Sequence, residues 1–228
     1  MLERLQSIRP RLEELARLDP NFRLFGSRTH RYHLSPPLTP DEVAAFELFH
    51  GVFLPDDYRA FLLEVGSEGA GPYYGLSPLG NFEHAESASD EAHNFLVSPF
   101  PHRTQFNLLN DEFRHRCAQA SEEEEAALWS RFETEYFKDT WVFGTLCLAH
   151  EGCGMYDFLV VSGEERGSIW IDDRCNNGGL SPLQSNRFPD RTNENALFLR
   201  VNAAHTSFLD WYEWWLDWSL REAKEATT

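Results

Sequence analysis

The stretch LPDDYRAFLLEVGSEGAGPYYGLSPL occupies residues 54–79. Pro55 suits the first turn of a helix, and the two aspartates after it suit the positive end of the helix dipole. Apolar side chains then recur at helical spacing until Gly66, which is a natural end for a helix. The sequence therefore predicts a helix over 55–66, with an apolar face made by Tyr58, Phe61, Leu62 and Val65.

The residues on both sides of this helix extend the pattern. A glycine-rich turn at 69–72 leads to 73–76, where we expect a short strand followed by a turn. Upstream, residues 2–18 place Leu or Ile at every third or fourth position, which predicts an amphipathic helix. Another helix is expected over 39–51, with an apolar side that consists of Val43, Phe46, Leu48 and Phe49. Its start has Thr39 as N-cap, Pro40 at the first position and Glu42 in a capping box.

The middle of the chain is more polar. Residues 83–120 are expected to form long loops with few regular elements. Ser121 and Glu124 have the capping-box spacing, which predicts an acidic helix over 121–137. Residues 142–150, 155–162 and 167–172 are expected to form an antiparallel meander, because glycine-bearing turns separate them. Another loop is expected over 173–190. A largely buried, aromatic-rich helix is expected over 207–223, with Trp and Tyr around most of its surface.

Composition narrows the possible classes of function. The 228 residues carry 20 Lys+Arg and 37 Asp+Glu, a formal charge of −17. This charge argues against a nucleic-acid binder, which needs clusters of Lys and Arg. A 14% aromatic content excludes a disordered acidic chain. Because apolar runs are short and the N-terminus mixes both charge signs, we expect a soluble, cytoplasmic protein without a membrane span.

Two groups of residues suggest metal or thiol chemistry. Cys147, His150 and Cys153 could be zinc ligands, but there is no second knuckle, and a strand would point the first two in opposite directions. The polar loop holds a second group, made by His84, Asp90, Glu91, His93 and His102. For both groups we favour a structural role or a solvated loop, because the motif spacing is unspecific. No cysteine lies at a helix N-terminus or beside a cationic cluster, as an activated thiol requires.

Two acidic motifs also allow more than one interpretation. Asp172 and Asp173 follow an apolar strand directly, which suits acid–base chemistry or a turn. We favour the turn, with a second role as partner-binding surface. The run Glu122–Glu125 is most simply a solvated helix start.

Three blocks in order resemble the SUKH superfamily, which includes the Smi-one/Knr-four regulators of fungal cell walls and many bacterial toxin-immunity proteins. The first block, within 54–79, is the helix that begins at Leu54-Pro55 and the glycine-bearing turn near Gly66 and Gly69. The second runs from Gly152 through Asp157 to Trp170 and Asp172, and the third opens the C-terminal helix at 207–211. The resemblance covers most of 39–220. It implies one domain over 1–228, with an N-terminal helix and connector at 1–38 and a polar insertion at about 83–140.

The resemblance also implies a fold and a function. The fold would be α+β: helices packed on a mixed, mostly antiparallel sheet, with a core that includes Leu54, Tyr58, Phe61, Trp170 and Trp211. No catalytic residue, cofactor or metal is implied. The chain would be a non-enzymatic immunity protein that neutralises a toxin, such as a nuclease. A regulatory scaffold without a toxin is the alternative, and a metal-dependent or thiol enzyme is a third hypothesis.

An immunity protein needs a partner-binding surface. The net charge favours a basic toxin domain as partner. If the toxin is a nuclease, acidic side chains of this chain would face the positions where the nuclease binds phosphates. We expect the contact surface among exposed acids and aromatics: Tyr73, Tyr74, Glu122, Glu123, Glu124, Glu125, Asp172 and Asp173.

Overall fold

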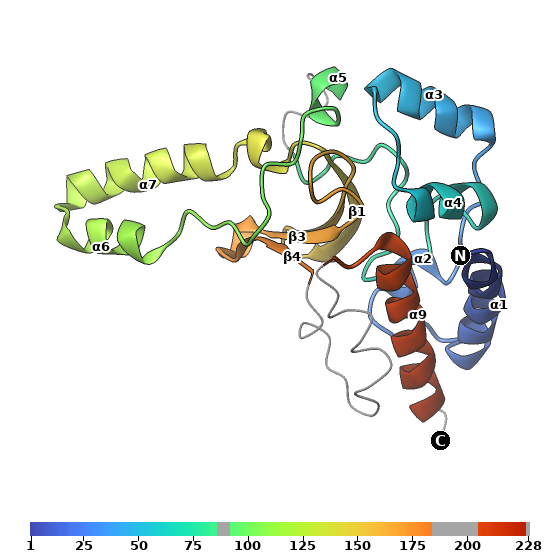
Figure 1. Cartoon of the computed structure of the whole chain (residues 1–228). Helices are drawn as coiled ribbons and strands as arrows, with labels where there is room; N and C mark the ends of the chain where they lie inside the picture. The colour runs from blue at the N-terminus through green and yellow to red at the C-terminus, as the bar shows by residue number, and fades with distance from the viewer. Residues whose placement is uncertain (86–91, 184–204, 227–228) are drawn as a thin grey trace.

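In the computed structural model, which describes residues 1–85, 92–183 and 205–226, a four-stranded antiparallel sheet lies between helices (Figure 1). The helices are α1 (Leu2–Leu18), α2 (Ser27–His30), α3 (Pro40–His50), α4 (Asp56–Glu64), α5 (Ala92–Phe95), α6 (Asp111–Gln119), α7 (Glu122–Tyr136) and α9 (Phe208–Glu225), with the 3-10 turns η1 (Asp139–Val142) and η2 (Arg174–Asn176). The strands are β1 (Thr145–Gly152), β2 (Met155–Val160), β3 (Ile169–Asp173) and β4 (Gly179–Pro182). The α+β prediction is confirmed.

The sheet is a meander in the order β1-β2-β3-β4. Its first three strands confirm the prediction, with Cys147 opposite Phe158 and Phe158 opposite Trp170. The fourth strand lies inside 173–190, where we expected a loop, so that prediction is wrong. Gly179–Pro182 is extended because β3 and Phe106 pair with it on its two sides, and neither pairing is encoded locally.

Loop segments cover both outer strands of the sheet. Beside β1, the backbone N–H groups of Tyr74 and Ser77 donate to the carbonyls of His150 and Leu148, and Cys147 donates to Asn81. Beside β4, Phe106 and Leu180 exchange two backbone hydrogen bonds of 2.8 Å. Some backbone polar groups at each of these two edges are therefore engaged within the chain.

The main core lies between the sheet and the helices α1, α4 and α9. Phe61 of α4 contacts the rings of Phe208 and Tyr212 of α9 at centroid distances of 5.0 and 4.8 Å. Arg4 of α1 forms ion pairs with Asp210 and Glu213 of α9. The five predicted core residues, Leu54, Tyr58, Phe61, Trp170 and Trp211, are all buried.

Local signals placed the helix starts correctly. The predicted capping boxes of Thr39 with Glu42 and of Ser121 with Glu124 are both formed. The C-terminal helix begins after Ser207, whose side chain accepts a hydrogen bond from the backbone of Asp210. These starts need only residues that are close in sequence, and this is why they could be predicted.

Residues 83–120 contain more regular structure than we expected. Helix α6 begins after Asn110, whose side chain accepts from the N–H of Phe113, and it forms an antiparallel hairpin with α7. Figure 1 shows this hairpin extending away from the sheet. The division into 1–38, 39–220 and an insertion at about 83–140 stays a prediction.

The expected strand at 73–76 is wrong. These residues form a turn in which Tyr73 has a φ of +53°, and the extended pairing is limited to single bridges of Gly69 with Leu34 and Leu76. Gly26 approaches this turn so closely that a Cβ atom on it would lie 1.5 Å from the carbonyl oxygen of Tyr73. Because Gly26 has no side chain, its backbone can pack against this turn, which stands where the side-chain pattern favoured a strand.

Candidate functional site

An exposed apolar patch surrounds the C-terminal end of α3. Leu48, Phe49 and Phe53 are 85%, 56% and 80% exposed, and Val97 beside them is 46% exposed. We call these four residues the α3 patch. The prediction that Leu48 and Phe49 belong to the core-facing side of this helix is wrong. Val43 packs inward as expected, whereas Leu48 and Phe49 face outward.

Polar groups on the inner side of α3 explain this orientation. Glu47 is 8% exposed, and its carboxylate accepts from the N–H of Leu54 at 3.0 Å and from Arg59 at 3.3 Å. His50 is also buried, and its ring lies 4.4 Å from that of Phe46. Because these polar residues occupy the inward positions of the last turns, the apolar residues between them lie on the outside.

The backbone beneath the patch is held in place. Arg166 donates to the carbonyls of Phe53 at 3.1 Å and Leu54 at 2.9 Å. Ser162 donates to the carbonyl of Val97 at 3.2 Å. The turn between β2 and β3 therefore joins the two segments of the patch, so the patch needs little reorganisation before it binds a partner.

Charged residues border the patch. Asp56 is exposed at the start of α4, directly after the loop that carries Phe53. Glu164 is exposed in the β2–β3 turn and pairs with Arg103. An apolar centre with a polar border is the usual anatomy of a protein–protein interface.

A second exposed surface includes the predicted aromatics. Tyr74 is 41% exposed and lies 5.3 Å from the ring of Phe25, which is 56% exposed. On its other side Tyr74 stacks on His150 at 5.8 Å. Tyr73 is half-buried and packs against the core. Of the two predicted tyrosines, Tyr74 is the one that offers its ring to solvent.

Comparison with known proteins identifies the family. The model of the SMI1/KNR4 family (SUKH-1) matches residues 37–190. The chain belongs to the SMI1/KNR4 family. No curated protein and no solved structure matches it. Among the described residues of this SUKH-1 protein, no helix is long and apolar enough to cross a membrane.

The predicted acidic residues of this SUKH-1 protein lie in different surroundings. Glu122, Glu123, Glu124 and Glu125 are all exposed in the first turn of α7, where the carboxylate of Glu124 completes the capping box. Asp173 is half-buried and accepts from the side chain of Asn176 at 2.9 Å. In Figure 1 the hairpin and α3 lie on opposite sides of the sheet, so the acidic run and the α3 patch are separate surfaces.

Asp172 does not lie on the surface. It is 4% exposed and pairs with Arg174, which is 3% exposed, so our expectation of an exposed carboxylate at this position is wrong. The alternation of the strand explains the difference, since Asp172 and Asp173 leave the sheet on opposite faces. Arg174 two residues later neutralises the inward carboxylate, and that spacing was available in the sequence.

In the cysteine group, Cys147 and His150 lie in strand β1, and Cys153 lies in the turn that follows it. Cys147 is buried in β1, and burial raises the pKa of its thiol to about 12, so it carries no thiolate at neutral pH. His150 lies between the rings of Tyr74 and Tyr156. Cys153 is exposed in the β1–β2 turn.

The residues of the histidine group also lie in separate surroundings. His84 is buried, and desolvation together with the charge of Arg174 lowers its pKa to about 3. His102 stacks on Phe106 at 4.4 Å and contacts the carbonyl of Trp141. Asp90 and Glu91 lie outside the described residues. Within the described ranges, no three His, Cys, Asp or Glu side chains are grouped so that they could hold a metal ion.

Proposed function

We propose that this SUKH-1 protein is a cytoplasmic, non-enzymatic immunity protein that binds and neutralises a cognate bacterial toxin. The observation that carries the proposal is the α3 patch, in which four large apolar side chains are exposed above a fixed backbone. Exposed apolar patches with a polar border are typical of protein-binding sites. Membership of the family supports the same class of function.

The energetics of the patch suit a partner surface. Leu48 and Phe53 are the most exposed of the large apolar side chains in the described part of the chain. Covering each of them would contribute about 1.5–3 kcal/mol from the removal of apolar surface from water. Because the backbone of these residues is already ordered, binding loses little conformational entropy there, and little of this free energy is offset.

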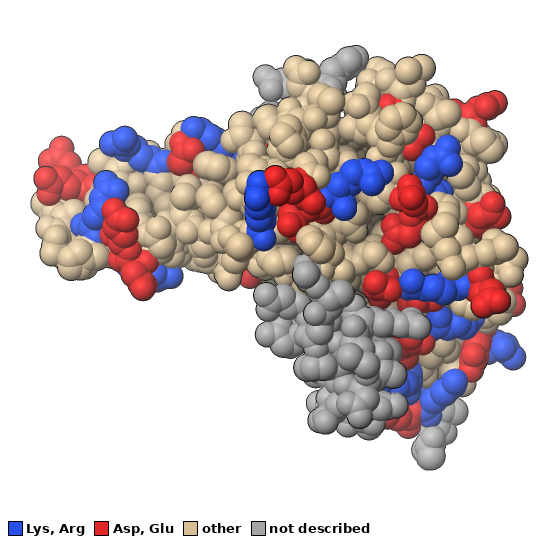
Figure 2. Space-filling view, viewed as in Figure 1, with Lys and Arg blue, Asp and Glu red and all other residues tan. Residues whose placement is uncertain are grey.

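The charge of the chain favours a basic partner, such as a nuclease domain. The net charge is −17, and Figure 2 shows Asp and Glu side chains distributed over the visible face, interspersed with Lys and Arg. This distribution would speed the encounter with a basic protein rather than define one contact. Tyr74 and the exposed glutamates of α7 remain proposed as additional contacts.

The proposed mechanism is occlusion. The bound immunity protein covers the active site or the substrate surface of the toxin, and its carboxylates occupy positions that would otherwise hold phosphates. No chemistry by this chain is needed.

Co-expression tests the proposal. The chain is produced together with the candidate toxin encoded beside its gene, and growth and co-purification are measured. The paired variant Leu48→Lys with Phe53→Lys removes apolar area and adds repulsion toward a basic partner, so we expect growth rescue and co-purification to be lost. Leu2→Lys is the matched control, because Leu2 is also 59% exposed but lies on α1.

Two results would overturn the proposal of a toxin partner, and a third would overturn the proposed contact surface. Failure of the wild-type chain to protect cells or to bind the neighbouring toxin would favour the regulatory scaffold, as would the absence of a toxin gene beside it. Equal loss of binding in the Leu2→Lys control would show that the α3 patch is not the contact surface.

A further inference from the structure

The α6–α7 hairpin has a small apolar cluster of its own, separate from the main core. Leu109, Phe132 and Tyr136 are buried in it, and Leu108, Phe113 and Phe137 pack against them. Buried Arg174 holds its base, with hydrogen bonds to the carbonyls of Tyr136 and Lys138. The hairpin therefore projects from the sheet with its base held in place. Its two helices bury only a few side chains between them.

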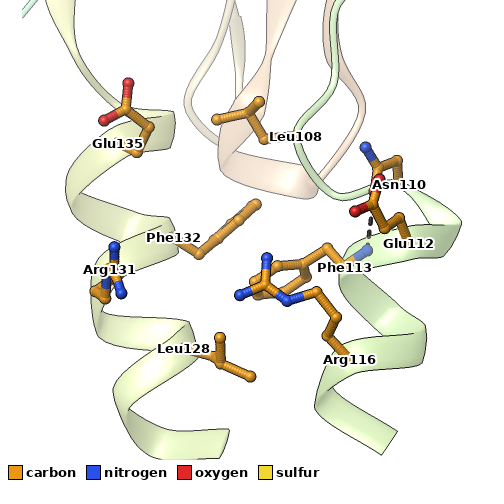
Figure 3. Close-up of a pocket in the computed structure, with 9 residues that line it drawn as sticks. All are labelled: Leu108, Asn110, Glu112, Phe113, Arg116, Leu128, Arg131, Phe132 and Glu135. Atoms are coloured by element: carbon orange, nitrogen blue, oxygen red, sulfur yellow. Dashed lines mark hydrogen bonds between the residues drawn. The ribbon is translucent and has the colours of Figure 1, made fainter.

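A groove runs between the two helices of the hairpin. Two cavities of about 350 and 430 Å³ lie along it, and both are lined by Arg116, Leu128 and Arg131. Figure 3 shows Leu128 pointing from α7 into the space between the helices and Arg116 reaching across from α6. Because the cavities share these residues, they form one groove with an apolar floor, into which Arg116 reaches and beside which Arg131 lies on α7.

Both arginines are available for a partner. Arg116 and Arg131 are exposed, and within the described residues neither guanidinium forms a hydrogen bond or an ion pair. A guanidinium beside an apolar surface is well suited to a carboxylate on an otherwise apolar segment. The groove therefore favours a ligand that combines apolar and acidic side chains.

The chain itself exposes such a segment on α7. Glu124, Ala127, Leu128, Arg131 and Glu135 line the groove from α7 and recur every three or four residues, so they form one stripe on the helix. The stripe has a carboxylate at each end, Glu124 and Glu135, with Ala127 and Leu128 in the middle and the guanidinium of Arg131 before Glu135. An antiparallel copy of this stripe is complementary to it.

We propose that the α6–α7 hairpin is a self-association surface, on which the α7 helices of two copies pack antiparallel about a two-fold axis. We place the two-fold axis between Ala127 and Leu128. Glu124 and Arg131 then lie at equal distances on either side of the axis, about 5 Å along the helix at 1.5 Å per residue. Glu124 of each copy therefore faces Arg131 of the other. The small side chain of Ala127 allows close approach, and the α7 helix of the other copy covers Leu128 in the groove of each copy. Such isologous pairing closes after two copies and completes a four-helix bundle.

Long-range charge opposes this association. Each copy carries a net charge of −17, which favours the separated state. We therefore expect a weak dimer.

Sedimentation equilibrium of the full chain from ~1 µM to ~1 mM tests the inference. The wild-type protein should change from monomer to dimer over this range. Glu124→Arg and Arg131→Glu should each weaken the dimer at least ~10-fold, because each creates two contacts between like charges. Glu124→Arg also removes the capping-box carboxylate of α7, so Arg131→Glu is the decisive single variant. The chain that carries both changes should recover the dimer, since the reversed charges again face each other.

Matched controls separate this effect from the change in net charge. Glu133 lies on the opposite side of α7 from the stripe, and Arg114 is exposed on α6 outside the groove lining. Glu133→Arg and Arg114→Glu should leave the dissociation constant within ~2-fold. Circular dichroism checks that every variant retains its helices.

A wild-type chain that stays monomeric up to ~1 mM would overturn the inference. The same conclusion would follow if the doubly changed chain stayed as weak as the single variants. Toxin binding through the α3 patch is measured separately, so either proposal can fail without the other.

Discussion

The guanidinium of Arg174 lies 2.6 Å from the carboxylate of Asp172, and both side chains are buried between the sheet and the base of the hairpin. Arg174 also donates to the carbonyl oxygens of Tyr136 and Lys138 at 3.2 and 3.4 Å. One side chain therefore neutralises a buried carboxylate and satisfies backbone groups where α7 ends.

Replacement of Arg174 should be costly. Arg174→Ala leaves the carboxylate of Asp172 buried without its partner, so we expect the free energy of unfolding to fall by about 3–5 kcal/mol. Urea denaturation measures this change. Arg103→Ala is the control, because its ion pair with Glu164 is exposed and should be worth less than about 1 kcal/mol. Equal losses in the two variants would contradict the role given to Arg174.

Stability should depend on pH through His84. Its Nε2 lies 2.7 Å from the hydroxyl of Thr145, which itself donates to the carbonyl of Val142. Nε2 therefore carries the proton, and a second proton on Nδ1 would be buried without an acceptor. Burial lowers the pKa from 6.5 to about 3, so the unfolded chain binds more protons than the folded chain between these values.

The sign of this effect follows by linkage. The stabilisation is present above pH 6.5 and is lost progressively as the pH falls toward 3. From pH 7 to pH 5 the loss attributable to His84 should be about 2 kcal/mol. Denaturation curves of wild type and His84→Gln at both pH values measure it. Identical pH dependence in the two proteins would show that His84 does not contribute.

The thiols should divide into two classes. Cys153 and Cys175 are exposed, whereas Cys117 and Cys147 are buried. Iodoacetamide should therefore modify the first two rapidly in the native protein, and all four after unfolding, as measured by mass spectrometry. Rapid modification of Cys147 would contradict the raised pKa of its thiol and would revive the thiol-enzyme hypothesis.

A buried hydrogen bond joins α9 to the sheet. The indole N–H of Trp211 donates to the carboxylate of Asp157 at 2.7 Å, and both side chains are buried. Trp211→Phe removes the donor and should lower the free energy of unfolding by about 1–3 kcal/mol. Trp218→Phe on the half-buried side of α9 is the control, where we expect a smaller loss. Thermal unfolding of both variants distinguishes these outcomes.

Much of the fold was predictable because its signals are local. The helices α1, α3, α4, α7 and α9 follow from apolar spacing and from caps such as Thr39 and Ser121. The first three strands follow from glycine turns between apolar runs. Strand β4 was not predictable in this way, because Gly179–Pro182 is extended only through its pairing with distant residues. Helix α6 was missed although Asn110 is a clear N-cap.

The candidate surfaces were harder to predict than the fold. An apolar residue at helical spacing was assigned to the core, yet Leu48 and Phe49 face outward because Glu47 and His50 occupy the inner positions. Acidic residues were assigned to the surface, yet Asp172 is buried because Arg174 neutralises it. Glu47 is held inward by the N–H of Leu54 and by Arg59, which lie outside α3, and the helical spacing does not reveal these contacts. Arg174 lies only two residues after Asp172, so the second case could have been inferred from the sequence.

The loops that run along β1 and β4 have a consequence for the behaviour of the chain at high concentration. Outer strands of a sheet are where chains add to one another strand by strand and polymerise. Here Tyr74, Ser77 and Asn81 engage the outer side of β1, and Phe106 engages that of β4. A foreign strand must first displace these hydrogen bonds, so fibril growth from the native sheet is disfavoured.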